Sequence, residues 1–288
     1  MTTMSLRPRG IGEILDGAFR LYKEDIGLYV LTATLGALPW AVVMIGTLSD
    51  SGGALAVSFV FMLLALLLTV VVWAALMHQM NIRLQGQQPA FGPSVKRGLS
   101  LFLRVSWGAI LAYIVLAGGM MVWGMGAMLA TFLGGLAHPI AGAILGIGAG
   151  LALLYFVFFR AIAGASLFLP GIVVEERTGY QSVKRGFALS KEGTGRIVAV
   201  LFVSWVLVFV PLMASYFITG TTATLVDPEA MANGTVTSGQ MALQQLLAVV
   251  ASGFTTPFLV ACILLVHFDQ RVRLEAFDLE AEADALAG

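Results

Sequence analysis

Long apolar stretches dominate this chain and are interrupted by short polar segments. Six of the stretches reach the roughly 20 apolar residues that a helix needs to cross the hydrocarbon layer. They cover residues 26–48, 54–78, 105–131, 139–160, 196–219 and 241–267. These stretches lack the alternation of membrane-barrel strands, and a helix bonds its own backbone groups within lipid. The pattern therefore predicts an all-α, polytopic membrane protein with six transmembrane helices.

A second, shorter pattern precedes each pair of apolar stretches. Apolar positions recur at helical spacing within residues 11–23, opposite charged positions, and shorter stripes of this kind begin at Val95 and Val183. A helix with one apolar side and one basic side tends to lie flat in the headgroup layer. We therefore expect three hairpin units, 1–80, 81–168 and 169–288, each led by a short amphipathic interfacial helix. The alternative is that the leading segments are ordinary loops beside the membrane.

The pentapeptide SVKRG occurs twice, at residues 94–98 and again at residues 182–186. Each copy lies ahead of a long apolar stretch, and self-similarity at a fixed period indicates tandem units. We interpret the two copies as anchors whose cations hold the entry of a hairpin at the membrane surface and attract anionic lipid. The candidate interfacial lipid contacts are Lys96, Arg97, Lys184 and Arg185.

Composition and charge agree with this architecture. Hydrophobic residues make up 59% of the chain and charged residues only 11%, against about 25% charged residues in soluble domains. Sixteen basic and sixteen acidic residues cancel, so we expect no nucleic-acid partner. All basic residues lie in the terminal segments, in residues 79–104 or in residues 160–196. By the positive-inside rule, both termini are cytoplasmic and three short loops face outward.

Arg160 is the most informative single residue of the apolar part. It follows an aromatic run and precedes fourteen largely apolar residues, so it lies at the inner interface or deeper. An unpaired arginine at the bilayer centre costs at least about 2.5–3.5 kcal/mol, so a deep Arg160 needs a partner. The two interpretations are a contact with an anionic ligand or lipid head group, and a structural ion pair or snorkelling side chain. The candidate partners are Glu175, Glu176, Glu13 and Asp16.

The segment after the last apolar stretch carries two oppositely charged pairs at a spacing of four residues. The pairs are Asp269 with Arg273 and Arg271 with Glu275. This spacing brings opposite charges together on a helix and adds a few tenths of a kcal/mol to its stability. We therefore expect the sixth transmembrane helix to continue beyond the membrane.

Small residues and prolines mark the packing of the membrane helices. Three glycines four residues apart favour close approach of another helix, either from the same chain or from a second copy. Three prolines lie inside predicted spans, where each removes a backbone donor and kinks the helix. The glycines are Gly142, Gly146 and Gly150, and the prolines are Pro39, Pro211 and Pro257.

No group of residues matches a catalytic or metal-binding motif. Glu175 and Glu176 lack the arginine and paired histidines of intramembrane prenyl proteases, and the two histidines His78 and His267 make too small a ligand set for a metal site. The single cysteine, Cys262, lies in an apolar run and is expected to be a packing residue. We therefore expect a protein that is not an enzyme and has no cofactor and no metal site.

Three segments resemble a known family. Residues 6–22, LRPRGIGEILDGAFRLY, are similar to the opening of bacterial proteins that carry the glycerophosphoryl diester phosphodiesterase membrane domain. Residues 269–279, DQRVRLEAFDL, resemble their closing signature, and residues 160–175 and 182–190 resemble their middle. The resemblance implies a multi-pass protein of the bacterial plasma membrane. The predicted loops leave no room for the soluble phosphodiesterase domain of about 250 residues.

These observations predict a non-catalytic integral membrane protein of the bacterial inner membrane that acts as a scaffold or accessory subunit. Its expected partners are membrane lipids, anionic ones among them, and a membrane protein. The alternative is a transporter or lipid-handling protein in which Arg160 contacts an anionic group.

Overall fold

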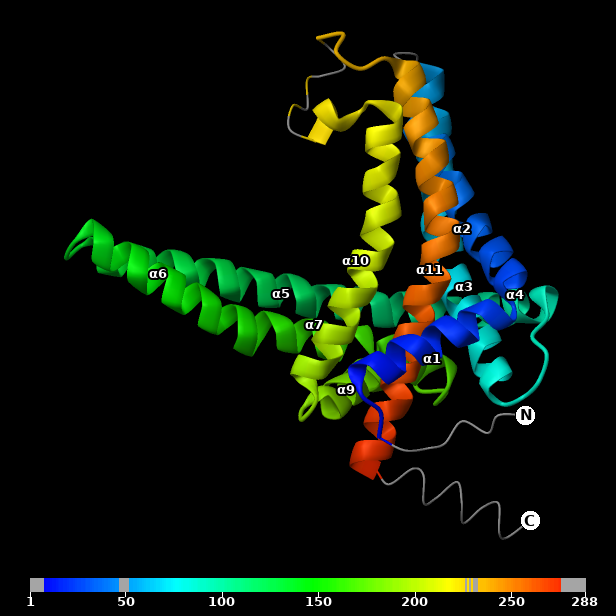
Figure 1. The fold of residues 1–288 in the computed structure, drawn as a ribbon, viewed down its shortest axis with the longest axis horizontal. Helices are drawn as coiled ribbons and strands as arrows, with labels where there is room; N and C mark the ends of the chain where they lie inside the picture. Colours follow the sequence, from blue (N-terminus) through cyan, green and yellow to red (C-terminus); the bar gives the residue numbers. More distant parts are fainter. Residues whose placement is uncertain (1–7, 47–51, 226, 228, 230–232, 276–288) are drawn as a thin grey trace. The chain divides into compact units, whose positions relative to one another are not determined.

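The structure is a computed structural model that describes residues 8–46, 52–225, 227, 229 and 233–275. Within this part of the chain it consists of helices and connecting turns, without a strand (Figure 1). The loop predicted around Asp50 and the chain beyond Glu275 lie outside the described residues. The all-α prediction is confirmed.

Six segments of the described chain are long and apolar enough to cross a membrane. They are Ile26–Val43, Gly53–Leu84, Phe102–Gly135, Pro139–Val173, Thr194–Thr219 and Ser238–Glu275. Each overlaps one of the six stretches expected from the sequence. Many of their large apolar side chains are exposed, for example Leu103 and Met128. This exposure suits helices whose solvent is lipid, because hydrocarbon imposes no cost on an apolar surface.

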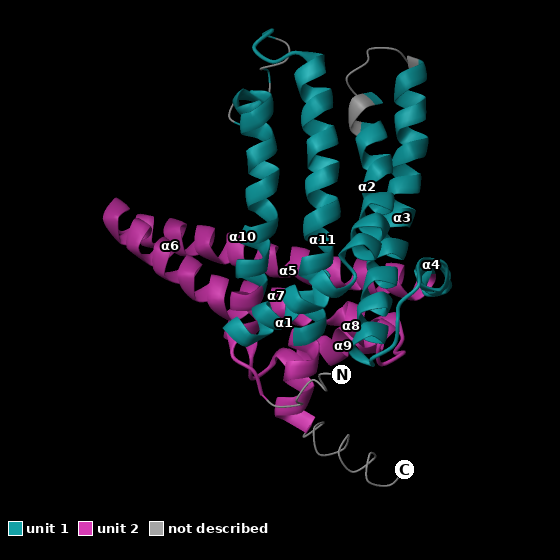
Figure 2. Cartoon of the chain, turned by 45° about the vertical axis from the view of Figure 1, so that its right-hand side comes forward, with its two compact units in different colours: residues 1–2, 12–102, 201–265 teal, residues 3–11, 103–200, 266–288 magenta. Residues whose placement is uncertain are grey.

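The chain divides into two compact units, each built from separate parts of the sequence (Figure 2). Unit 1 contains residues 1–2, 12–102 and 201–265, and unit 2 contains residues 3–11, 103–200 and 266–288. Two long helices, α10 (Thr194–Thr219) and α11 (Ser238–Glu275), contribute residues to both units. The three sequential hairpin units expected from the sequence remain a prediction.

Unit 1 is organised around the antiparallel pair α2 (Ile26–Gly46) and α3 (Gly52–Leu84), preceded by α1 (Ile11–Glu24). Polar contacts join α3 to α2 and to the segment just before it. Arg83 Nε of α3 lies 2.6 Å from Glu24 Oε2 at the end of α1 and 3.2 Å from Asp25 Oδ2 in the following turn. Further along, buried Gln79 of α3 donates to the hydroxyl of Thr32 in α2 at 3.0 Å. Polar side chains of α3 thus contact polar groups of the chain that precedes it.

Unit 2 contains the hairpin of α5 (Phe102–Gly135) and α6 (Pro139–Leu153). Gly142 and Gly146 are buried, and a Cβ on Gly142 would lie 2.7 Å from the Thr131 carbonyl oxygen of α5. The indole of Trp123 also donates to the Gly150 carbonyl at 3.0 Å. The predicted glycine face therefore packs within the chain, which confirms the first of the two alternatives for this stripe.

The rest of unit 2 follows α6 in a series of short helices. A π-helical turn, η1 (Leu154–Phe159), leads into α7 (Arg160–Ser166), α8 (Phe168–Val173) and α9 (Gly179–Ser190). The remaining short elements of the chain are α4 (Phe91–Ser100) and the 3-10 turn η2 (Thr222–Leu225), which both belong to unit 1. Helices α2, α10 and α11 continue through their internal prolines.

The SVKRG copies form parts of α4 and α9, and the structure assigns their small residues a role in packing. Ser94 and Gly98 of α4 are buried, and so are Ser182 and Gly186 of α9. A Cβ on Gly98 would collide with the Val71 carbonyl of α3, and one on Gly186 with the Gly164 carbonyl of α7. Each copy therefore packs its serine–glycine face against the span that precedes it, because small residues allow backbones to approach closely.

Helix α1 shows the same spacing of buried positions without the pentapeptide. In α1, α4 and α9 the buried residues stand at positions i, i+4 and i+7, the third of them directly after α4. Aligned on these positions, α1 and α9 also share a phenylalanine, a lysine and a glutamate. The buried sets are Ile14, Ala18 and Leu21, then Ser94, Gly98 and Leu101, then Ser182, Gly186 and Leu189; the shared residues are Phe19, Lys23 and Glu24 with Phe187, Lys191 and Glu192.

Gly98→Ala is expected to destabilise the protein by about 1–3 kcal/mol, because the added methyl overpacks the contact with Val71. Gly92→Ala in the same helix is the matched control, since a Cβ there meets nothing within 4 Å. The control should be as stable as the wild type or slightly more so, because alanine favours a helix over glycine. Thermal unfolding in detergent, followed by tryptophan fluorescence, measures the difference. Equal stability of the two variants would show that the close approach is not needed.

Candidate functional site

The residue that gathers the most charged partners in the described chain is Glu175, in the loop between α8 and α9. The loop begins where α8 ends, and Glu176 adopts the left-handed conformation with φ 55°. A residue in this conformation commonly terminates a helix. The amide of Arg177 bonds the Gly171 carbonyl at 3.1 Å, which closes the turn. The turn leaves the Glu175 side chain only 8% exposed.

Four side chains surround the Glu175 carboxylate. Arg177 Nε lies 2.5 Å and Arg185 Nε 3.0 Å from Oε2. From α11, His267 Nε2 lies 3.1 Å and Arg271 Nε 3.6 Å from Oε1. The set combines a loop, α9 and the last turns of α11, and all of these residues belong to unit 2.

Glu275 extends this group into a network. It forms an ion pair with Arg185, and Arg271 Nε lies 3.2 Å from its Oε2. His267, Arg271 and Glu275 are successive positions four residues apart, so one face of α11 supplies them. We call the six residues Glu175, Arg177, Arg185, His267, Arg271 and Glu275 the Glu175 cluster. It holds three arginines and two carboxylates, so its formal net charge with His267 neutral is +1, and its opposite charges stabilise one another.

The cluster keeps Glu175 ionised. Burial alone would raise the pKa of the Glu175 carboxyl, but His267, Arg177 and Arg185 together hold this pKa well below its ordinary value of 4.5. The neighbouring carboxylates in turn raise the pKa of Arg185 despite its partial burial. Glu175 therefore stays ionised, and both of its oxygens are occupied by neighbouring side chains. Such a carboxylate is a poor general base.

A second charged group lies on another side of the same end of α11. Asp269 is fully buried and accepts from the amide of Arg9 at 2.7 Å and from Arg273 Nε at 3.0 Å. Arg196 Nε lies 3.4 Å from the same carboxylate, and Arg273 Nη2 donates to the Arg9 carbonyl at 2.7 Å. These contacts tie the segment before α1 and the start of α10 to α11, again within unit 2.

The charged pairs predicted after the sixth stretch are confirmed. Arg273 bonds Asp269 at 3.0 Å, and Arg271 bonds Glu275 at 3.2 Å. Helix α11 continues to Glu275 as expected. Their sequence spacing, however, did not reveal their other partners, because Glu175, Arg185 and Arg196 lie far from them along the chain.

Arg160 and Glu175 are not brought together. They stand at opposite ends of the α7–α8 segment, and Glu175 bonds other cations. Arg160 is exposed at the first position of α7. Of its other candidate partners, Asp16 lies 3.3 Å from Arg20 in α1, Glu13 is exposed in the same helix, and Glu176 is exposed beside Glu175.

The four candidate lipid contacts have different surroundings. Lys96 and Lys184 are exposed, and Arg97 is partly buried. Arg185 points into the Glu175 cluster and is only 17% exposed, so it is occupied by carboxylates. Val183 of the same pentapeptide packs against Ala112 and Ala165 in the core of unit 2. The second copy therefore contributes more to internal packing than its basic composition indicates.

Within the described residues no three His, Cys, Asp or Glu side chains lie close enough to hold a metal ion. Cys262 is buried, in agreement with the packing role expected for it. No protein-family model, curated protein or solved structure matches the chain. The function is therefore inferred from the residues themselves.

Glu175→Gln is expected to destabilise the protein by about 3 kcal/mol, because it removes the charge of a buried carboxylate to which partly buried Arg185 and Arg271 are paired. Glu192→Gln is the matched control, since Glu192 is an exposed glutamate of the same unit. Thermal unfolding of both purified variants in detergent measures the effect. If the two variants unfold at the same temperature, the Glu175 cluster does not stabilise the fold.

The pH dependence of unfolding provides a second readout for the same pair of variants. Because the folded-state pKa of Glu175 is depressed, its stabilisation is fully present above about pH 4.5 and is lost as the pH falls toward the folded pKa. The wild type and Glu192→Gln should therefore lose this stability on acidification, whereas Glu175→Gln has none of it to lose. A parallel decline of all three proteins would contradict the assignment.

Proposed function

We propose that the protein is a non-catalytic integral membrane protein that acts as a scaffold or accessory subunit in a bacterial inner membrane. The observation that carries this proposal is the saturation of Glu175. Its carboxylate is buried, ionised and surrounded by cations. Such a group joins helices, whereas a general acid or base needs a pKa near the working pH.

The membrane and the orientation are parts of the same proposal. The resemblance of residues 6–22 and 269–279 to bacterial proteins with the glycerophosphoryl diester phosphodiesterase membrane domain supports the bacterial plasma membrane. The distribution of lysine and arginine supports cytoplasmic termini. Helices α1, α4 and α9 would then lie at the cytoplasmic head groups, with exposed Lys96 and Lys184 close to anionic lipid.

Reporter fusions test the orientation. Fusions placed after Asp50, His138 and Asn233 should all score as external, because the segments around them contain no lysine or arginine. A fusion after Gln87, between α3 and α4, is the control and should score as cytoplasmic. A cytoplasmic score at any of the three external positions would overturn the map.

A second candidate function is that of a transporter or lipid-handling protein in which Arg160 contacts an anionic group. The observation that favours it is local. Arg160 is exposed and directly follows the π-helical turn Leu154–Phe159, and such turns often mark functional positions in helices. An exposed arginine within an apolar span can meet a phosphate or a carboxylate.

Affinity purification from native membranes distinguishes the two candidates. The tagged wild type is expected to retain a protein partner in fixed stoichiometry, and Arg160→Gln should retain the same partner. Recovery of the wild type without such a partner would overturn the scaffold proposal. If instead the wild type carries an anionic small molecule that Arg160→Gln loses while remaining folded, the second candidate is correct.

A further inference from the structure

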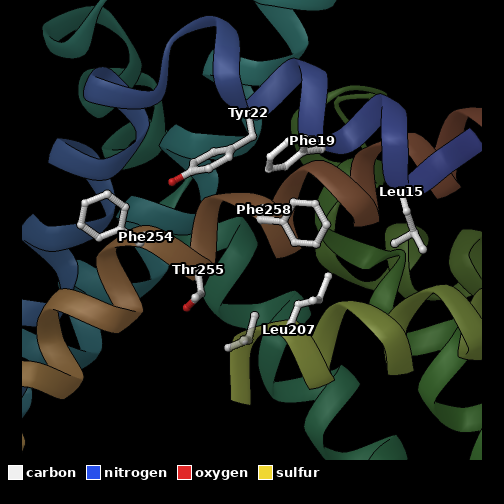
Figure 3. Close-up of a pocket in the computed structure, with 8 residues that line it drawn as sticks. Leu15, Phe19, Tyr22, Leu207, Phe254, Thr255 and Phe258 are labelled. Atoms are coloured by element: carbon white, nitrogen blue, oxygen red, sulfur yellow. The ribbon is translucent and has the colours of Figure 1, made fainter. Parts of the chain in front are cut away.

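A groove in unit 1 is lined almost entirely by apolar side chains (Figure 3). Helix α1 provides one wall, and α10 and α11 provide the others. The volume of the groove is about 320 Å³, at the lower end of the roughly 300–1,000 Å³ of small-molecule sites. It is lined by Leu15, Phe19, Tyr22, Leu207, Val208, Phe254, Thr255 and Phe258, all of them residues of unit 1.

The two polar side chains of the lining do not make the groove polar. The Thr255 hydroxyl donates to the Ala251 carbonyl of its own helix at 2.9 Å, which leaves the methyl group for the groove. Tyr22 is uncharged at neutral pH, as tyrosine ordinarily is, and burial raises its pKa further above the ordinary value of 10.0. The groove therefore fits an uncharged hydrocarbon segment.

Counted from its start at Ser238, α11 reaches the groove after about one thickness of the hydrocarbon layer. Phe254 and Phe258 follow Ser238 by 16 and 20 residues, or about 24 and 30 Å at 1.5 Å per residue. The hydrocarbon layer itself is about 30 Å thick. With the start of α11 at one edge of the layer, the groove lies at the level where the acyl chain of a lipid joins its head group.

A cation stands beside the groove at this level. Lys23 Nζ lies 5.3 Å from the centre of the Phe19 ring, within the range of a cation–π contact. Phe19 lines the groove, and Lys23 follows it by one helical turn. The charged side of α1 also presents Arg20, paired with Asp16. Hydrocarbon and negative charge are thus recognised by neighbouring residues of one short helix.

We propose that this groove binds one acyl chain of an anionic membrane phospholipid, whose phosphate lies near Lys23. The occupant is a lipid because α10 and α11 are long and apolar enough to cross a membrane, and a groove on such helices faces hydrocarbon once they are inserted. Half-exposed rings at Phe19 and Phe254 are covered when the chain is bound. The site is separate from the Glu175 cluster and does not rest on the scaffold proposal.

Photocrosslinking tests the acyl-chain site. The full chain is reconstituted in vesicles of phosphatidylglycerol and phosphatidylcholine that contain a trace of phosphatidylglycerol with a diazirine on one acyl chain. Mass spectrometry of the labelled peptides should place the label on α1 and on α11 around Phe254–Phe258, several-fold above the exposed methionines of α5. Uniform labelling of all spans, or crosslinks to a second copy in place of lipid, would overturn the site.

Matched variants then separate the groove from the general lipid surface. Leu207→Trp fills the groove and should lower labelling of α1 several-fold, whereas Val206→Trp, at an exposed position of α10 that does not line the groove, should not. Thr255→Phe fills the groove from α11 and provides a second test if Leu207→Trp does not fold. If every groove-filling variant that folds labels like Val206→Trp, the proposal is wrong.

A comparison of two lipid probes tests whether the site prefers an anionic head group. A phosphatidylcholine probe with the same modified chain should label α1 several-fold less than the phosphatidylglycerol probe. Lys23→Gln should remove this preference, whereas Lys96→Gln, an exposed lysine of the same unit, should retain it. Equal labelling by the two probes in the wild type would overturn the role of Lys23 and the choice of an anionic lipid.

Discussion

The mutual neutralisation of charges at the end of α11 is the interaction on which the rest of unit 2 depends. A buried carboxylate is tolerated only when cations and hydrogen bonds replace the water that it loses. Glu175 obtains them from its own loop, from α9 and from α11. Asp269 does the same with Arg273, Arg196 and the backbone of Arg9. The two carboxylates thereby fasten four separate parts of the sequence to one helix end.

The same neutralisation bears on the choice between functions. A catalytic site usually contains a titratable group whose pKa lies near the working pH and whose lone pairs face a substrate. Glu175 has the opposite properties, because its ionised form is the one that the surrounding arginines stabilise. The apolar groove beside α1 can bind a ligand without reacting with it. The Glu175 cluster thus belongs to unit 2, and the proposed hydrocarbon site belongs to unit 1.

Much of the fold could be predicted from the sequence, because apolar length and helical spacing act locally. The six long helices, the glycine face of α6 and the pairs at Asp269 and Arg271 all follow from such patterns. The partners of Glu175 could not be predicted, because spacing relates only residues of the same helix and α9 and α11 meet through the tertiary fold. Because the sequence does not show tertiary contacts, Glu175 was named as a candidate partner of Arg160, whereas in the structure Glu175 bonds other cations. The four-residue spacing of His267, Arg271 and Glu275 is a sequence signal for one polar face on α11, but it does not show what covers that face.

The pentapeptide shows that a basic motif can also carry a packing role that its composition does not indicate. Its lysine and arginine suggested a surface anchor, yet the positions that α1, α4 and α9 share are the buried ones. Serine and glycine at these positions let α4 and α9 touch the backbone of the preceding span. In α1 the corresponding positions hold Ile14 and Ala18, whose larger side chains prevent so close a contact. The adjacent face of α1 carries Leu15, Phe19 and Tyr22, and these residues line the apolar groove instead of a close backbone contact.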